Sequence, residues 1–134
     1  MTNQDDAALH ILVVDDSNTI RRSADLFLTQ AGYQVTLAED GFDALSKIAA
    51  QTPGLIFCDI LMPRIDGYQL CALLKQNERY RDIPIVMLSS KDSLFDRARA
   101  SLVGADEYLT KPFSKESLLQ TVSAQINAGH PGKD

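Results

Sequence analysis

The sequence predicts an α/β protein with a doubly wound, five-stranded parallel sheet in the flavodoxin-like order 2-1-3-4-5 and five helices on its two faces. Apolar runs of strand length alternate with segments of helical period, and only a few residues separate one from the next. The apolar runs also lack the polar alternation of a half-exposed strand, which indicates a sheet covered on both sides. Strands that alternate with helices in this way form right-handed βαβ units, which place helices on both faces of the sheet.

The first half of the chain holds two strand–helix pairs. Short apolar runs predict strands at residues 11–14 and 35–38. Ser17 or Asn18 caps the first helix, and Gly32 ends it. The second helix follows Asp40-Gly41, and its buried stripe is predicted at Ala44, Leu45, Ile48 and Ala49.

The second half holds three more pairs, with strands predicted at residues 55–59, 83–88 and 107–110. The helices are predicted at 68–77, from a cap at Asp92 or Ser93 to Gly104, and from a cap at Ser114 to Asn127. Their inward positions are predicted to be Leu70, Leu73 and Leu74, then Leu94, Ala98 and Leu102, then Leu118, Leu119, Val122 and Ile126. The domain therefore spans residues 9–127, with flexible tails at 1–8 and 128–134.

Size and charge exclude several classes of protein. The chain has 134 residues, 45% hydrophobic and 23% charged, which fits one globular domain. A net charge of -5 without a Lys/Arg cluster argues against binding to nucleic acid. The sequence has no membrane-length apolar run and no secretion signal, so we expect a cytoplasmic protein without membrane insertion. We also expect a monomer. Cys58 and Cys71 are then expected to be buried free thiols, with a disulfide or redox pair as the alternative.

The strand ends carry the residues that suggest chemistry. Because parallel strands share a carboxyl edge, Asp15, Asp16, Asp59, Ser89 and Lys111 are expected to meet there. Three carboxylates repel one another unless a cation lies among them, and hard oxygen ligands without His or Cys favour magnesium. A metal ion, an ammonium and a hydroxyl around one carboxylate can bind a phosphoryl group.

Asp59 is the best candidate for the phosphoryl acceptor, because it stands alone at a central strand end whereas Asp15 and Asp16 are paired as metal ligands would be. Taken singly, each residue also has a plainer interpretation. Asp59 only terminates a strand, the acidic pair only favours a helix N-terminus, Ser89 is a turn residue and Lys111 is a solvated cation.

Four segments together resemble response-regulator receiver domains: Val13–Ser17 (VVDDS), Asp59–Gly67 (DILMPRIDG), the hydroxyl of Ser89 and Lys111–Phe113 (KPF). The resemblance covers residues 10–127. It implies that Asp59 takes a phosphoryl group from a phosphohistidine on a sensor histidine kinase.

The resemblance also implies roles for the residues around Asp59. Asp16, Asp59 and the backbone carbonyl of Leu61 would coordinate Mg²⁺, with Asp15 doing so largely through water. Lys111 and Ser89 would each contact a phosphoryl oxygen, and the Lys111-Pro112 bond would be cis. Because the apolar side chain of Leu61 cannot position a water, we expect slow self-dephosphorylation and no other enzymatic activity.

A switch is implied as well, in which Ser89 moves toward the phosphoryl group and Tyr108 turns into the vacated space. The plainer interpretation of Tyr108 is a strand aromatic with its hydroxyl at the surface. Phe95 and Arg99 flank the predicted stripe of the helix after Ser93, so a partner face of Phe95, Arg99 and Tyr108 is expected. The plainer interpretation of Phe95 is an aromatic at the edge of the core.

Three stretches, 66–75, 89–98 and 108–115, more closely resemble receivers that control twitching motility through type IV pili. Because the chain ends after the last predicted helix, output is expected to pass by contact with a downstream protein of the pilus or motility machinery.

Two other classes compete with the receiver. A haloacid-dehalogenase-type hydrolase also uses a strand-end aspartate and magnesium, but its Asp-x-Asp pattern is broken here by Leu61. A small flavin-binding domain would need a phosphate-cradling loop after the first strand, where Asp15 and Asp16 would instead repel the phosphate.

Overall fold

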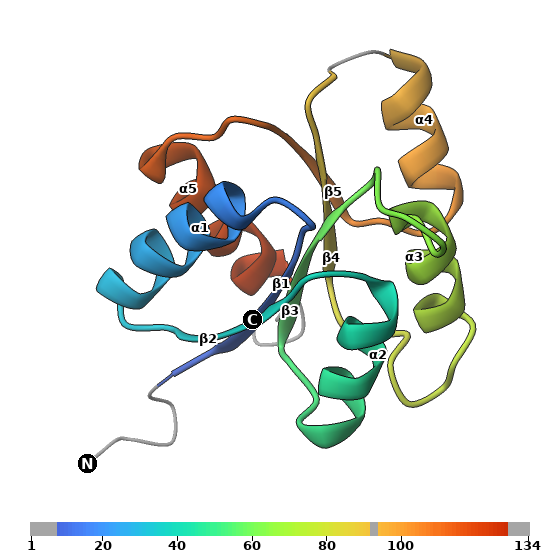
Figure 1. The fold of residues 1–134 in the computed structure, drawn as a ribbon, viewed down its shortest axis with the longest axis horizontal. Coiled ribbons are helices and arrows are strands. Elements are labelled where there is room, and N and C mark those ends of the chain that lie inside the picture. The colour runs from blue at the N-terminus through green and yellow to red at the C-terminus, as the bar shows by residue number, and fades with distance from the viewer. Residues whose placement is uncertain (1–7, 92–93, 129–134) are drawn as a thin grey trace.

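The computed structural model describes residues 8–91 and 94–128 as one parallel sheet between two layers of helices (Figure 1). The strands are β1 (His10–Val14), β2 (Gln34–Ala38), β3 (Leu55–Asp59), β4 (Ile85–Ser89) and β5 (Glu107–Thr110). The helices are α1 (Asn18–Gln30), α2 (Gly41–Ala50), α3 (Gly67–Lys75), α4 (Leu94–Leu102) and α5 (Lys115–Ala128). The sheet order is β2-β1-β3-β4-β5 with every pairing parallel, which confirms the predicted fold class.

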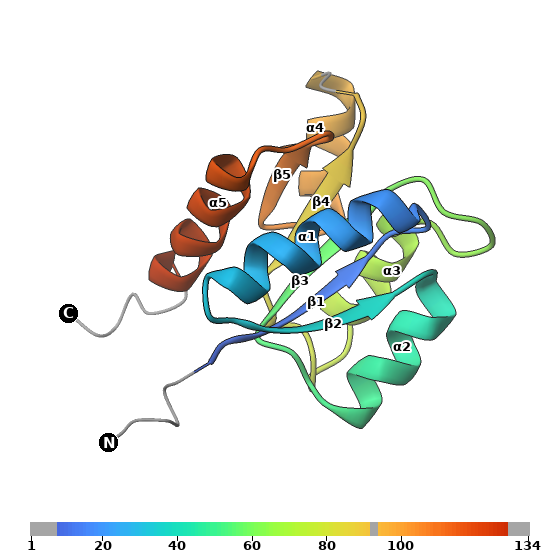
Figure 2. The same ribbon diagram turned by 60° about the vertical axis from the view of Figure 1, so that its left-hand side comes forward.

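Helices cover both faces of the sheet. Figure 2 shows α1 and α5 on one face and α2, α3 and α4 on the other. Neighbouring residues of β1 divide between the two cores accordingly: Ile11 and Val13 pack toward Leu28 of α1, and Leu12 and Val14 toward Ile48 of α2. The near-continuous apolar strands follow from this arrangement, because both of their faces are buried.

Local capping chemistry fixes where the helices begin and end. Ser17, not Asn18, caps α1, and its side chain accepts a hydrogen bond from the backbone of Ile20 at 3.3 Å. Asp66 caps α3 in a reciprocal capping box with Gln69. Gly32 follows α1 and Gly104 follows α4 with φ of 96° and 95°, which confirms the predicted ends. The predicted caps of α4, Asp92 and Ser93, and most of the two predicted tails lie outside the described residues.

Some predicted boundaries and inward positions were wrong. Strand β4 begins at Ile85 because the N–H of Ile83 closes a turn with Tyr80 and Pro84 has no N–H to donate. Leu73 is 49% exposed because the buried face of α3 runs through Leu70, Cys71 and Leu74, and Ala49 of α2 is likewise exposed.

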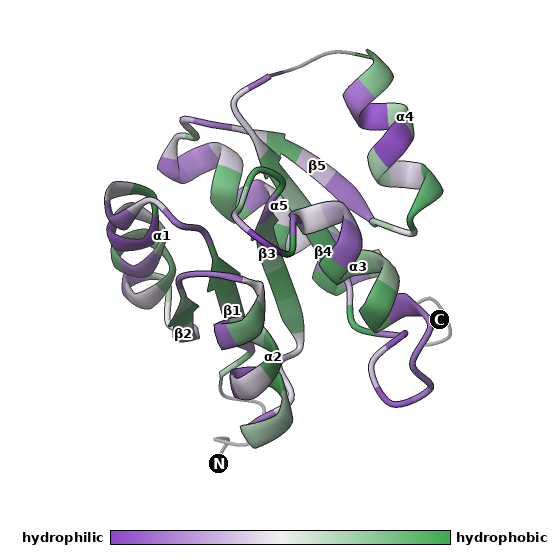
Figure 3. Cartoon of the chain, turned by 45° about the vertical axis from the view of Figure 1, so that its right-hand side comes forward, coloured by the Kyte–Doolittle hydropathy of each residue, from purple (hydrophilic) through white to green (hydrophobic). Residues whose placement is uncertain are grey.

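The predicted stripe of α4 was also wrong. Leu94 and Leu102 are 86% and 87% exposed and Ala98 faces solvent, whereas Ala100 is buried. The inner face of this helix makes contact through Ala100 and through arginine side chains that lie over tyrosine rings. Figure 3 shows the result: hydrophobic residues at both ends of α4 and hydrophilic ones between them.

Cys58 and Cys71 are buried free thiols, as predicted, and burial raises the pKa of both. No helix among the described residues combines the length and the apolarity needed to cross a bilayer.

Candidate functional site

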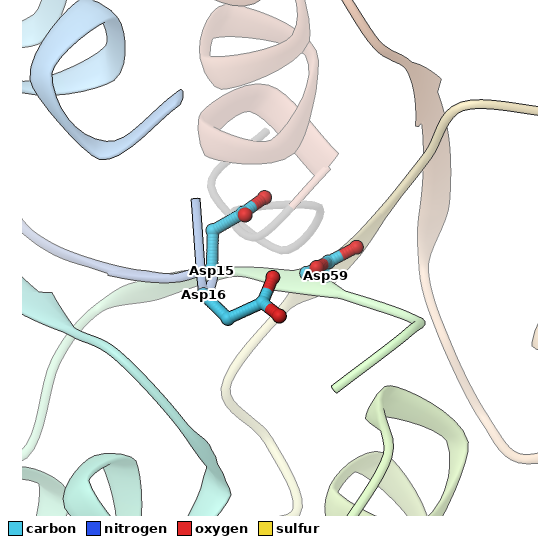
Figure 4. Close-up of side chains that lie close together, drawn as sticks. All are labelled: Asp15, Asp16 and Asp59. Atoms are coloured by element: carbon cyan, nitrogen blue, oxygen red, sulfur yellow. The ribbon is translucent and has the colours of Figure 1, made fainter. Parts of the chain in front are cut away.

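Three carboxyl groups meet at the carboxyl edge of the sheet. Asp15 and Asp16 follow β1, and Asp59 ends the adjacent strand β3. Figure 4 shows the three side chains close together, and one carboxylate oxygen from each lies within 4.8 Å of the others. The parallel topology thus assembles the predicted cluster from two segments more than forty positions apart.

Asp15 is held rigidly at this edge. Its carboxylate accepts one hydrogen bond from the backbone N–H of Ser17 at 2.8 Å and one from the ammonium of Lys111 at 3.0 Å. Its backbone N–H donates to Ala38 at 3.1 Å, and its backbone carbonyl accepts from the guanidinium of Arg21 at 2.7 Å. Asp15 is fully buried whereas Asp16 is exposed, so Asp16 presents the more accessible carboxylate.

Lys111 joins the two buried carboxylates, because its Nζ lies 3.0 Å from an oxygen of Asp15 and 3.0 Å from an oxygen of Asp59. Burial raises the pKa of Asp59 to about 6, the neighbouring charge of Asp15 adds to the rise, and Lys111 partly offsets it. Burial alone would lower the pKa of Lys111, but the two carboxylates raise it above its ordinary value. Lys111 is therefore a charged member of the site and not a solvated surface cation.

The donor set fits a divalent cation. The edge gathers three carboxylates against one ammonium, and burial together with the charge of Asp15 raises the pKa of Asp59 despite that ammonium. Carboxylate and carbonyl oxygens without imidazole or thiolate are the ligands that Mg²⁺ prefers. The grouped oxygens of Asp15, Asp16 and Asp59 are therefore the candidate ligands in the described part of the chain.

Ser89 and Tyr108 both hydrogen-bond to the backbone of Lys91, in the segment after β4. The buried hydroxyl of Ser89 accepts a hydrogen bond from the N–H of Lys91 at 3.0 Å. The hydroxyl of Tyr108 donates to the carbonyl of the same residue, and the Arg97 guanidinium lies 4.7 Å from the Tyr108 ring centroid. Tyr108 is only 7% exposed, and its hydroxyl is bonded to a backbone carbonyl.

The loop after Asp59 turns sharply into α3. Arg64 in this loop has a φ of 67°, and the N–H of Gly67 donates to the carbonyl of Ile60 at 2.8 Å. The side chain of Leu61 is 68% exposed at this point. At the opposite side of the same edge, the Lys111-Pro112 bond is cis, as predicted.

The predicted partner residues lie on α4 and β5. Phe95 is 72% exposed, which excludes its interpretation as an aromatic at the edge of the core. The guanidinium of Arg99 lies 4.3 Å from the ring centroid of Tyr68, a buried residue of α3 whose hydroxyl donates to the carbonyl of Asp96 at 3.5 Å.

Two residues near the site were missed at the sequence level. Arg21 is six positions after Asp15, and Tyr68 directly follows the predicted loop. The sequence carried no signal for either contact, because a bond to a backbone carbonyl and the stacking of one helix on another depend on tertiary geometry. The only sequence feature that pointed to Tyr68 was its position directly after Gly67, at the end of the predicted loop.

Replacing Lys111 with methionine is expected to raise the pKa of Asp59 further, because it removes the cation that offsets burial and the charge of Asp15. Carboxyl ¹³C NMR across a pH titration of the metal-free protein measures this directly. Lys115→Met, at an exposed position of α5, is the control and should leave the titration unchanged. An unaltered Asp59 titration in Lys111→Met would contradict the assigned role.

Comparisons with known proteins agree with this geometry. The family model described as response regulator receiver domain matches residues 11–123. The chain is 53% identical to Protein PilG of Pseudomonas aeruginosa over 131 residues, which cover 98% of this chain and 96% of PilG. It is 40% identical to response regulator MprA of Mycobacterium avium over 94% of its own length and 54% of MprA.

Solved structures show the same likeness. Chemotaxis protein CheY4 of Vibrio cholerae superposes with a TM-score of 0.84 at 35% identity, over 88% of this chain and 98% of that one. The receiver domain of the Francisella response regulator 1452 superposes with a TM-score of 0.82 at 31% identity, over 90% and 98% of the two chains.

Proposed function

The chain belongs to the response regulator receiver family, and from that premise we propose that it is a phosphorylation-gated binding module whose acceptor is Asp59. One observation carries the proposal most directly. Asp59 is a buried carboxylate with a raised pKa, paired with Lys111 and close to two further carboxylates at a strand end. An aspartate that only ends a strand would not need an ammonium and two further carboxylates beside it.

The proposed reaction transfers a phosphoryl group from a phosphohistidine of a sensor histidine kinase. An oxygen of Asp59 forms the new bond to phosphorus, the P–N bond breaks, and the imidazole nitrogen leaves with the electron pair and takes a proton from water. Lys111 lies within reach of an oxygen of the incoming group, and Ser89 donates its hydroxyl to another after releasing the N–H of Lys91. Asp16, Asp59 and the Leu61 carbonyl would hold Mg²⁺, with Asp15 acting through water, and the ion would supply charge neutralisation for the phosphoryl group.

We propose that the change is transmitted through Ser89 and Tyr108. Because Ser89 accepts from the N–H of Lys91 and Tyr108 donates to the carbonyl of the same residue, a movement of Ser89 toward the phosphoryl group shifts the Lys91 backbone and frees the Tyr108 hydroxyl. The surface that would change contains Phe95 and Arg99 of α4, and this surface is the proposed partner face. The exposed Phe95 ring is its anchor.

The similarity to PilG supports a role in a chemosensory pathway that controls type IV pili, with a downstream protein of that machinery as the partner. The proposed setting is the cytoplasm, and the proposed form is a monomer that binds no nucleic acid, in keeping with the net charge of -5. Self-dephosphorylation is proposed to be slow, because the apolar Leu61 side chain cannot orient a water toward the phosphoryl group.

The test is incubation with a small acyl-phosphate donor and Mg²⁺, followed by intact-mass measurement. We expect a gain of one phosphoryl group, its loss when a chelator removes the metal, and a borohydride-trapped product that maps to Asp59. A gain that maps to another residue overturns the acceptor assignment. Turnover of a panel of small phosphate esters would instead support the hydrolase alternative.

A further inference from the structure

Arg21 connects the end of β1 to the first turns of α1. Its guanidinium donates one hydrogen bond to the backbone carbonyl of Asp15 at 2.7 Å and a second to the side-chain oxygen of Asn18 at 3.2 Å. Its backbone N–H donates to the carbonyl of Ser17, the cap of α1, at 3.1 Å. Arg21 is half-buried, whereas the next residue, Arg22, is exposed. No step of the proposed phosphoryl transfer uses this guanidinium.

The carbonyl that Arg21 contacts belongs to the peptide group that joins Asp15 to Asp16. Because a peptide group is planar, a hydrogen bond that fixes its carbonyl also fixes its N–H and the Cα of the following residue. The orientation of this peptide group therefore sets where the side chain of Asp16 leaves the backbone. Arg21 thus acts on Asp16 through the main chain.

Asp16 depends on its backbone more than the other two members of the acidic cluster do. Asp15 is fully buried, and its carboxylate is held by the N–H of Ser17 and the ammonium of Lys111. Asp59 is also buried, at the end of a strand that is paired on both sides. Asp16 is exposed, so neighbouring atoms restrict its side chain less. Even so, Figure 4 shows its carboxylate turned toward Asp59, and one oxygen from each of the three side chains lies within 4.8 Å of the others.

The geometry of a guanidinium suits this role. It is planar and donates in fixed directions, so its bonds to Asp15 and Asn18 form together only in a narrow range of orientations. Asn18 is the first residue of α1, and the Ser17 cap fixes that end of the helix. Asp15 is therefore tied to the sheet through its N–H, which donates to Ala38 at 3.1 Å, and to α1 through its carbonyl.

The charge of Arg21 alone has the opposite effect on a metal ion. The guanidinium contacts a residue of the acidic cluster, and a cation beside the cluster repels a second cation. By charge alone, Arg21 therefore weakens the binding of a divalent ion. By positioning Asp16 it strengthens that binding. Because the two effects differ in sign, removal of the side chain shows which one dominates.

We infer that Arg21 is a positioning residue for the metal site. It acts through the peptide group between Asp15 and Asp16 to hold the carboxylate of Asp16 where, together with Asp59, it binds a divalent cation. This inference rests on the proposed function, because it requires Mg²⁺ to bind at the three carboxylates. It gives α1 a part in setting the Mg²⁺ concentration at which Asp59 is phosphorylated.

The test measures Mg²⁺ binding to the unphosphorylated chain by backbone amide NMR as magnesium chloride is added in stages. Arg21→Met removes the charge and both donated bonds but keeps most of the apolar stem. It should weaken Mg²⁺ binding about 10-fold, the lower end of the loss typical of partners that orient metal ligands. Arg21→Lys should lose less, because its ammonium can still donate to the Asp15 carbonyl. Phosphorylation of Arg21→Met by a small acyl phosphate should be slow at low Mg²⁺ and recover as the Mg²⁺ concentration is raised, which a general distortion of the site would not allow.

Arg22→Met is the matched control, because it removes the same charge from the next, exposed position of α1. It should bind Mg²⁺ within about twofold of wild type, since solvent and salt screen an exposed charge. Mg²⁺ binding by Arg21→Met that equals or exceeds that of wild type overturns the inference and leaves the acceptor assignment intact. An equal loss in Arg21→Met and Arg21→Lys overturns it too, because the loss would then follow from side-chain shape and not from the donated bond.

Should Arg21→Met fail to fold, Arg21→Lys decides the matter, and an Mg²⁺ affinity equal to that of wild type overturns the inference. Absence of saturable Mg²⁺ binding by the wild-type chain would instead count against the proposed function, and against this inference with it.

Discussion

Replacing Asp59 with asparagine is expected to abolish phosphorylation and, in the metal-free protein at pH 8, to stabilise the fold by about 1–3 kcal/mol. The first effect follows because an amide oxygen is not a competent phosphoryl nucleophile. The second follows from the raised pKa of Asp59, about 6 against an ordinary value of 3.8. The ionised carboxylate of Asp59, which phosphorylation requires, therefore lowers the stability of the folded protein.

The pH dependence has a definite sign. Between about pH 4 and pH 6 the folded protein retains the proton on Asp59 that the unfolded chain has lost, so wild-type stability falls as the pH rises through this window. Above it, the folded state carries a buried carboxylate that burial and Asp15 disfavour and Lys111 only partly compensates. The asparagine variant lacks this loss, so its advantage is greatest above pH 6 and disappears toward pH 4.

Urea unfolding of both proteins at pH 4.5 and pH 8, in the presence of a chelator, measures the difference. Asp82→Asn, at an exposed position, is the control and should match wild type at both values. Adding millimolar Mg²⁺ should stabilise wild type more than the variant, because binding to the native state adds to its stability. Equal stabilities at pH 8 without metal would contradict the assigned strain at Asp59.

The sequence predicted the sheet order and the residues that meet at its carboxyl edge because both depend on local patterns. Apolar runs set the strands, parallel pairing aligns their ends, and Asp15, Asp16 and Asp59 then have to converge. The cap of α1 at Ser17, one of the two residues predicted for it, likewise follows from capping chemistry that is local to the helix.

Helix α4 shows where such patterns fail. Leu94, Ala98 and Leu102 have the spacing of a buried stripe, yet they face solvent. The opposite side of α4 is secured instead by Arg97 over Tyr108 and Arg99 over Tyr68, contacts that depend on where α3 and β5 lie. Apolar periodicity alone does not distinguish a helix face that packs in the core from an exposed apolar face that can bind another protein.

Replacing Gly67 with alanine is expected to destabilise the fold by about 1–3 kcal/mol. An added Cβ would overlap the carbonyl oxygen of Asp59 and lie 2.8 Å from the Cα of Ile60. These are backbone atoms at the proposed acceptor, so they cannot move aside without moving Asp59. A shift of about 1 Å at a reacting group costs on the order of 100-fold in rate, and phosphorylation by acyl phosphate should fall by that amount.

The expected loss of stability is opposite in sign to the change that helix propensity alone predicts. Gly67 is the first residue of α3, where helix propensity alone favours alanine over glycine by up to about 1 kcal/mol. Gly41→Ala is the matched control, because Gly41 occupies the same position of α2 after an aspartate cap. There the added Cβ would meet chiefly the side chain of Ile65, at 3.0 Å, so the penalty should be smaller and phosphorylation by acyl phosphate largely kept. If Gly67→Ala proved as stable and as active as Gly41→Ala, the close approach of α3 to the backbone of Asp59 would not be what positions the acceptor.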